Sequence, residues 1–126
     1  MNAPLLDLSY LFEISGGDPT YIYEVLTLFI DTVPANLYAL EKTIRESDDF
    51  ELIHRQAHSL KSSASIVRIR DLYENITRID VLSREKKGKP EIVTCLDNVL
   101  ANFNKALPLI EAERGRNIPA DRQTPQ

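Results

Sequence analysis

The chain has 126 residues, of which 43% are hydrophobic and 27% are charged, the balance of an ordinary soluble globular domain with one core. Its formal net charge is −4 and its basic residues form no stripe, which argues against a nucleic-acid-binding protein. The N-terminus lacks the pattern of a signal peptide, and no stretch approaches the roughly 20 apolar residues that span a bilayer. Cys95 is the single cysteine, which excludes an internal disulfide. Together these observations predict a cytoplasmic protein.

Apolar residues recur every three or four positions along almost the whole chain, and no convincing period-two segment is present, which predicts an all-helical fold. A short first helix is expected over about residues 7–14, and the Gly16-Gly17 pair ends it. The Asp18-Pro19 pair suits the N-cap and first turn of a second helix, which continues to about Ser47. The apolar stripe expected on this second helix is Ile22, Val25 or Leu26, Phe29, Val33, Leu37, Leu40 and Ile44.

Three further helices complete the expected fold. The third helix follows a short turn at Ser47–Asp49 and carries a seam of apolar residues, namely Phe50, Ile53, Ala57, Leu60, Ala64 and Val67. The fourth helix runs from about residue 69 to about residue 84 and buries Leu72, Ile76 and Ile79. The last helix opens at Pro90 and buries Val93, Leu96, Leu100, Phe103, Leu107 and Ile110.

Four long amphipathic helices joined by short loops predict an all-α fold, an antiparallel up-and-down four-helix bundle with a short extra helix at the N-terminus. We expect this domain to cover residues 5–114. The chain beyond it is rich in glycine, proline and polar residues, which predicts a disordered tail over residues 115–126. We expect the protein to be a monomer.

Residues 57–64, with the sequence AHSLKSSA, carry the candidate functional site on the third helix. Beside the apolar seam, one helix face displays the polar residues His54, His58, Lys61, Ser62 and Ser65. An exposed and neutral histidine can attack a phosphoryl group through one ring nitrogen, and a nearby lysine can offset the charge of the transferring group. The small hydroxyl residues leave room for a partner protein to approach the imidazole of His58. This pattern is typical of a phosphoryl carrier.

The same spacing leaves two other interpretations open. A histidine on a polar helix face is more often a solvated surface residue than a nucleophile. His54 and His58 also stand four residues apart, so that they could share a zinc ion, but zinc needs a third and a fourth ligand. The candidates for these, Asp80 and Cys95, have no diagnostic spacing, and we therefore expect neither a metal ion nor a cofactor.

The octapeptide resembles the signature of histidine-containing phosphotransfer (HPt) domains, which is commonly written A-H-x-L-K-G-S-[SA]. The resemblance extends from about Leu5 to Leu107, nearly the whole expected domain. Leu26 and Phe29 upstream, and Leu72 and Ile79 downstream, match apolar positions of the same family. By this resemblance His58 is the phosphorylated residue and Lys61 assists it.

The resemblance also suggests a role for Asp80 and for the surface around the histidine. Asp80 falls where many family members carry Glu or Gln, whose side chain accepts a hydrogen bond from the histidine ring. A solvated surface carboxylate is an equal alternative for Asp80, because Asp is one methylene shorter. Ser62, His54 and Ser65 are expected to face the partner protein.

Two residues depart from the family pattern, because Ser62 and Arg68 stand where it has glycines. Serine is small enough to keep the histidine accessible. A left-handed backbone at Arg68 would cost about 1 kcal/mol relative to glycine, so the break after the third helix is expected to change shape.

The function implied by the resemblance is that of an intermediate in a multistep two-component phosphorelay. Such a protein accepts a phosphoryl group from a receiver-domain aspartate and passes it to another receiver. Its partners would be receiver domains of response regulators or hybrid histidine kinases, and the Mg²⁺ that assists transfer would lie in the partner. The chain has no Walker loop and no kinase signature, so we expect no ATP site. The alternative is an interaction module that binds receivers without transferring phosphate.

Overall fold

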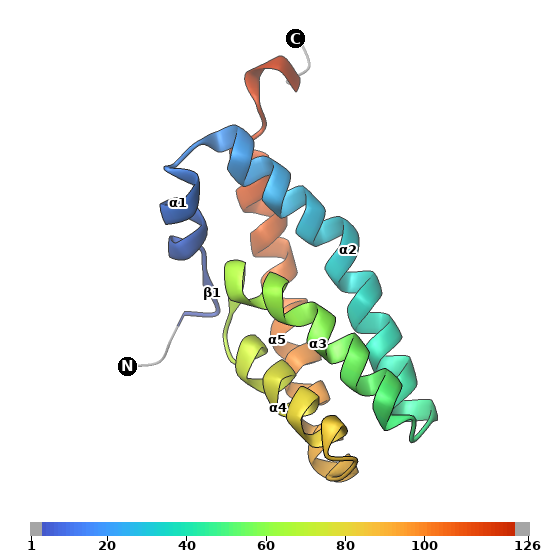
Figure 1. Ribbon diagram of the computed structural model, residues 1–126. Helices are drawn as coiled ribbons and strands as arrows, with labels where there is room; N and C mark the ends of the chain where they lie inside the picture. Colours follow the sequence, from blue (N-terminus) through green and yellow to red (C-terminus); the bar gives the residue numbers. More distant parts are fainter. Residues whose placement is uncertain (1–3, 123–126) are drawn as a thin grey trace.

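The computed structural model describes residues 4–122, which are mainly helical (Figure 1). In chain order the elements are β1 (Leu6–Asp7), α1 (Ser9–Ser15), α2 (Pro19–Glu46), α3 (Phe50–Ile66), β2 (Arg68–Ile69), α4 (Leu72–Arg84), α5 (Lys89–Arg116) and a 3₁₀ helix (Ala120–Arg122). The predicted short first helix and the four longer helices are therefore confirmed. None of the helices in this part of the chain is both long and apolar enough to cross a membrane.

The four long helices enclose one hydrophobic core. Helix α2 packs against α3 and α5, and α4 packs against the same two helices, so each long helix has two neighbours. Figure 1 shows α3 and α4 on the near side of the molecule, with α5 behind them. The apolar stripe predicted for α2 is buried along its whole length, with Leu26 rather than Val25 as its second member.

Aspartate side chains cap the N-termini of α2 and α3. The Asp18 side chain accepts a hydrogen bond of 3.0 Å from the backbone N–H of Thr20, and Pro19 follows at the first helical position. The Asp49 side chain likewise accepts from the backbone N–H of Leu52, at 3.1 Å. These caps satisfy N–H groups that have no partner within the helix. The predicted start of α2 at Asp18-Pro19 is thus confirmed.

The buried face of α5 differs from the prediction. Val93, Leu100 and Leu107 are only partly buried, whereas the buried residues of α5 are Ile92, Cys95, Leu96, Val99, Phe103, Ala106 and Ile110. Leu96, Phe103 and Ile110 were predicted correctly. Both α2 and α4 pack on this helix, so its buried face is wider than a single stripe and includes Ile92 and Val99.

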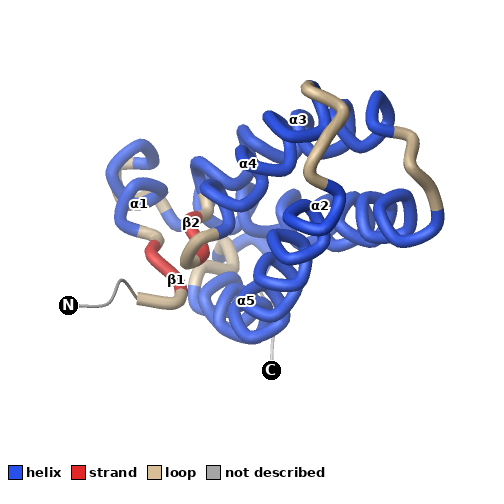
Figure 2. The backbone as a smooth tube through the Cα atoms, turned by 90° about the horizontal axis from the view of Figure 1, so that it is seen from below, coloured by secondary structure: helices blue, strands red, loops and turns tan. Residues whose placement is uncertain are grey.

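The structure adds one short pair of strands to the predicted all-α fold. β1 pairs antiparallel with β2, with Leu6 opposite Ile69 and Asp7 opposite Arg68 (Figure 2). Strands of two residues are too short to show an alternating pattern in the sequence. Arg68 is consequently extended rather than left-handed, and the positive φ of 60° falls on Asp71 instead. The backbone cost predicted for Arg68 does not arise, because Arg68 is extended. The left-handed position falls on Asp71, and Asp tolerates this region better than most residues.

The C-terminal segment has more structure than predicted. Helix α5 continues to Arg116, Asn117 and Pro119 are buried, and a 3₁₀ helix follows. The Arg122 guanidinium lies 3.2 Å from the Glu24 carboxylate of α2. Disorder predicted from residue 115 is therefore wrong for residues 115–122, because capping by Asn117 and this ion pair hold the segment. Residues 123–126 lie outside the described part of the chain.

Gly88 offers a test of how the loop before α5 is held. Gly88 has a φ of +72°, and a Cβ added to it would lie 2.9 Å from Leu82 Cδ2. We expect Gly88→Ala to lower the free energy of unfolding by about 1–2 kcal/mol, because alanine is strained at positive φ and Leu82 is packed in the core. Urea unfolding measures this change.

Gly115 supplies the matched control for this prediction. It lies in the last turns of α5, and an added Cβ would meet nothing within 4 Å. Gly115→Ala should stabilise the protein slightly, by up to about 1 kcal/mol, because alanine has the higher helix propensity. Equal effects of the two substitutions would contradict this account of Gly88.

Candidate functional site

Helix α3 presents His58 to solvent. The residues that α3 buries are Ile53, Ala57, Leu60 and Ala64, which fixes the rotation of the helix against the core. His58 falls beside this seam, and its side chain is 64% exposed. The histidine that the sequence singles out is therefore open to a macromolecular partner.

Helix α4 supplies a fully buried carboxylate beneath this histidine. Asp80 follows Ile79 on α4 and is 0% exposed. Its Oδ2 atom lies 3.3 Å from His58 Nδ1 and 3.5 Å from Lys61 Nζ. The alternative that Asp80 is a solvated surface carboxylate is thus wrong, because packing of α4 against α3 covers it.

Two further groups complete the surroundings of Asp80. Arg84, one turn along α4, places a guanidinium nitrogen 3.4 Å from Asp80 Oδ2. His54, one turn before His58, directs its Nδ1 atom at Asp80 Oδ1. The sequence interpretation missed Arg84, although its spacing of four residues from Asp80 on one helix was a usable signal.

The Asp80 carboxyl is held in its ionised form. Burial raises its pKa, but the contacts with the His58 and His54 rings and the positive charge of Arg84 lower it more. The net result is a pKa below the ordinary value of an aspartate. An ionised carboxylate only accepts hydrogen bonds.

The protonation of His58 follows from this partner. Because an ionised Asp80 only accepts hydrogen bonds, its contact with His58 Nδ1 favours the tautomer that carries the hydrogen on Nδ1. The neutral ring then has its lone pair on Nε2, at the edge of the ring away from the buried carboxylate. The arrangement leaves an exposed nucleophilic nitrogen in a fixed tautomer.

The serines near the histidine are placed differently from one another. Ser62 is exposed, one turn beyond His58. Ser65 is partly buried, and its hydroxyl donates to the backbone carbonyl of Ser62 at 2.7 Å. Of these two residues, Ser62 is therefore the more open to contact from outside.

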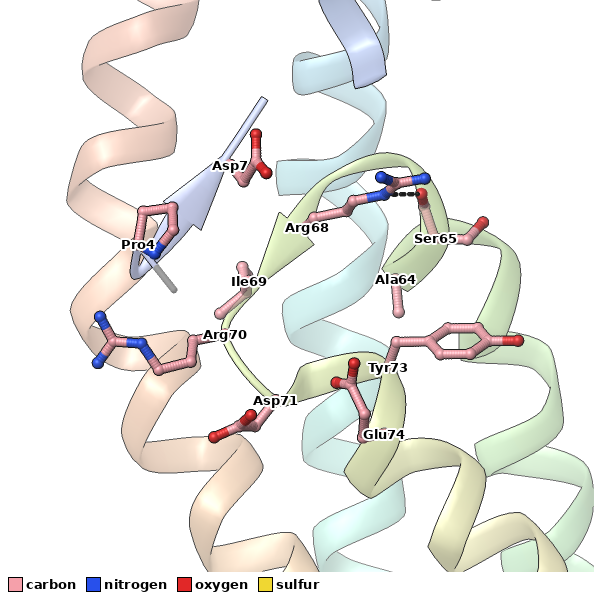
Figure 3. Close-up of a pocket in the computed structure, with 10 residues that line it drawn as sticks. All are labelled: Pro4, Asp7, Ala64, Ser65, Arg68, Ile69, Arg70, Asp71, Tyr73 and Glu74. Carbon is pink, nitrogen blue, oxygen red and sulfur yellow. Dashed lines mark hydrogen bonds between the residues drawn. The ribbon is translucent and has the colours of Figure 1, made fainter. Parts of the chain in front are cut away.

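A hollow of about 490 Å³ lies next to this site but does not include His58 (Figure 3). Ser65 lines it, together with the charged residues Asp7, Arg68, Arg70, Asp71 and Glu74. Figure 3 shows Arg68 turned toward Ser65, whose carbonyl accepts from its Nε atom at 3.0 Å. The charges of both signs give the hollow no clear preference for an ionic ligand, and His58 stands on the open surface instead.

The described residues do not provide the set of ligands that a zinc ion at His54 and His58 would need. Within residues 4–122, no group of three or more His, Cys, Asp or Glu side chains is arranged to hold a metal ion. Cys95, one of the candidate ligands, is buried on α5. Burial raises the pKa of its thiol, which disfavours the thiolate that a metal would need.

Comparison with known families agrees with the interpretation of the octapeptide. The family model described as Hpt domain matches residues 24–106, a segment that runs from α2 into α5 and contains both His58 and Asp80. The match lies within the domain predicted over residues 5–114. No curated protein and no solved structure matches the chain.

The depressed pKa of Asp80 predicts a pH-dependent contribution to stability. Because the folded-state pKa lies below the unfolded value of about 3.9, the ionised form stabilises the fold above that value, and this contribution is lost as pH falls through the folded pKa. We expect Asp80→Asn to lower the free energy of unfolding at pH 7 by about 1–3 kcal/mol, because buried donors lose their charged acceptor. The deficit should shrink as the pH falls below about 4. Urea unfolding across this range measures both effects.

Asp97 provides the control for this experiment. Its carboxylate pairs with Arg45 at 2.7 Å on the surface, where its side chain is 58% exposed. Asp97→Asn should change stability little, because exposed ion pairs contribute little. An Asp80→Asn protein as stable as the wild type at pH 7 would contradict the role given to the buried carboxylate.

Proposed function

The chain belongs to the Hpt domain family, whose members carry phosphoryl groups on a histidine in two-component phosphorelays. On that premise we propose that His58 accepts a phosphoryl group from a receiver-domain aspartate and passes it to a second receiver. The observation that carries this proposal is the exposed imidazole of His58, whose Nδ1 faces the buried carboxylate of Asp80 at 3.3 Å. His58 thus supplies a ring nitrogen as nucleophile, a partner that orients the ring, and a side chain that a receiver can reach.

The proposed step balances without a cofactor in this chain. The lone pair on His58 Nε2 attacks phosphorus, and an N–P bond forms as the P–O bond to the receiver aspartate breaks. The aspartate leaves as a carboxylate with the bonding electrons. His58 keeps its Nδ1 proton, and the positive charge that develops on the ring is balanced by Asp80. Attack by a second receiver aspartate reverses these changes, and the Mg²⁺ for both steps would be held by the receivers.

Lys61 is proposed to offset the charge of the transferring group. Its ammonium lies 3.5 Å from Asp80 Oδ2 and 6.0 Å from the centre of the Tyr73 ring, and its side chain is 26% exposed. The long and flexible lysine side chain can turn from these contacts toward a phosphoryl group on His58. Members of the family work without kinase activity of their own, in keeping with a role limited to transfer.

The finer architecture belongs to the same proposal. We infer that α2, α3, α4 and α5 form an antiparallel up-and-down bundle. Support comes from the short connections between consecutive helices and from the closed order of packing, in which α2 meets α5 and each helix meets the next.

The first functional prediction concerns the nucleophile. His58→Gln should abolish acceptance of an acid-labile phosphoryl group, because glutamine has no nucleophilic ring nitrogen. Helical content and melting temperature should change little, since the side chain is mostly exposed. Receiver domains charged with labelled acetyl phosphate in Mg²⁺ would serve as donors, and acid treatment would separate phosphohistidine from phosphoserine.

Glu51→Gln is the control, because it places the same side chain at an exposed position two turns earlier on α3. It should accept phosphate at the wild-type rate. Acid-labile label on the His58→Gln protein would overturn the assignment. Wild-type protein that binds receivers without acquiring label would support the non-transferring interaction module instead.

The second prediction concerns access through Ser62. A receiver must cover His58 closely, so Ser62→Arg should slow transfer from a receiver by about tenfold or more while the fold stays intact. Ser62→Gly should transfer nearly as the wild type does, with a stability cost of about 0.5 kcal/mol from helix propensity. Phosphoramidate, a small donor, should label both variants at wild-type rates, because it needs no protein interface. Full transfer from receivers to Ser62→Arg would mean that they approach from another side.

A further inference from the structure

Two histidines share the one buried carboxylate of this site. His54 and His58 stand one turn apart on α3, and their ring centres are 5.8 Å apart. Each ring directs its Nδ1 atom to Asp80, His54 to Oδ1 and His58 to Oδ2. His58 is therefore only one of two imidazoles that Asp80 orients.

The two oxygens of Asp80 are supported unequally. Oδ2 has three neighbours, which are His58 Nδ1 at 3.3 Å, Lys61 Nζ at 3.5 Å and Arg84 at 3.4 Å. Oδ1 lies against His54 Nδ1 alone, and neither of these two buried atoms makes a hydrogen bond with a described residue. Removal of His54 would leave one oxygen of a fully buried carboxylate without a donor.

His54 is also less accessible than its neighbour. Its side chain is 29% exposed, against 64% for His58, so it offers less surface to a docking protein. The sequence suggested a partner-facing role for His54, but its contact inside the site favours a different one.

We propose that His54 is a positioning residue for phosphotransfer, which holds Asp80 so that His58 keeps its proton on Nδ1 and presents Nε2 to the phosphoryl group. The proposal rests on the function assigned to His58 above. A carboxylate fixed at Oδ1 cannot rotate about its Cβ–Cγ bond, so Oδ2 stays in reach of His58. Without His54, Lys61 and Arg84 can draw the carboxylate away, and the tautomer of His58 is no longer fixed by a hydrogen bond at Nδ1.

Two substitutions of His54 separate this role from a merely structural one. His54→Asn keeps an N–H donor close to the place of Nδ1, whereas His54→Leu fills similar space without a donor. Leucine has the higher helix propensity, so loss of helix stability would harm the asparagine variant more. Positioning through Asp80 predicts the opposite order.

The experiment combines a spectroscopic and a kinetic measurement on the full chain. Long-range ¹H–¹⁵N correlation spectra at about pH 8.5, two units above the ordinary histidine pKa, report which nitrogen of His58 carries the proton. Phosphoramidate then labels His58 without any partner protein, and the rate of labelling is measured. Circular dichroism confirms that each variant is folded.

We expect the wild type and His54→Asn to keep the Nδ1–H form of His58 and to accept phosphate at similar rates. His54→Leu should shift toward the Nε2–H form and accept phosphate about tenfold more slowly, the scale typical of lost hydrogen-bond partners behind functional histidines. A His54→Leu protein with the wild-type tautomer and rate would overturn the proposal, as would equal losses in both variants. Failure of the wild type to acquire label at His58 would instead overturn the function proposed above.

Discussion

The ionised carboxylate of Asp80, buried between α3 and α4, is the constraint on which the site depends. A carboxylate removed from water is costly unless donors surround it. Helix α3 supplies three of these donors, His54, His58 and Lys61, at spacings of four and three residues, and α4 supplies Arg84. The apolar seam of α3 fixes its rotation against the core, and this rotation places the three side chains beside Asp80. The orientation of the proposed phosphoacceptor then follows from the way in which the two helices pack.

The lengths of these contacts suit a site that must change its charge. Distances of 3.3–3.5 Å from Asp80 Oδ2 to His58, Lys61 and Arg84 are long for hydrogen bonds, so each contact is individually weak. In the proposed relay a phosphoryl group adds negative charge at His58, and Lys61 or Arg84 can move toward it at little cost. Asp80 then still faces the imidazole, whose positive charge it balances. A single carboxylate can in this way support both forms of His58.

The sequence predicted those parts of the fold that depend on long periodic patterns. The buried stripe of α2 follows from its regular spacing over 28 residues, and the octapeptide of α3 located His58 and Lys61. The depth of Asp80 was not predictable in this way, because it depends on how α4 turns against α3 rather than on a local pattern. The same reason explains the wider buried face of α5, which two helices cover at once. The β1–β2 pair was missed because two residues show no period.

Arg68 shows how the fold replaces a glycine that the family pattern expects. Its backbone pairs with Asp7 in the β1–β2 ladder, its Nε donates to the Ser65 carbonyl at 3.0 Å, and its guanidinium lies 4.5 Å from the centre of the Tyr10 ring. The Arg68 side chain therefore links α1 to the end of α3, and a glycine at this position would make neither side-chain contact. The family match begins only at residue 24, yet Leu11 of α1 is fully buried in the common core. The segment before the match thus packs on the same core, and its residues Pro4 and Asp7 line the hollow beside the candidate site.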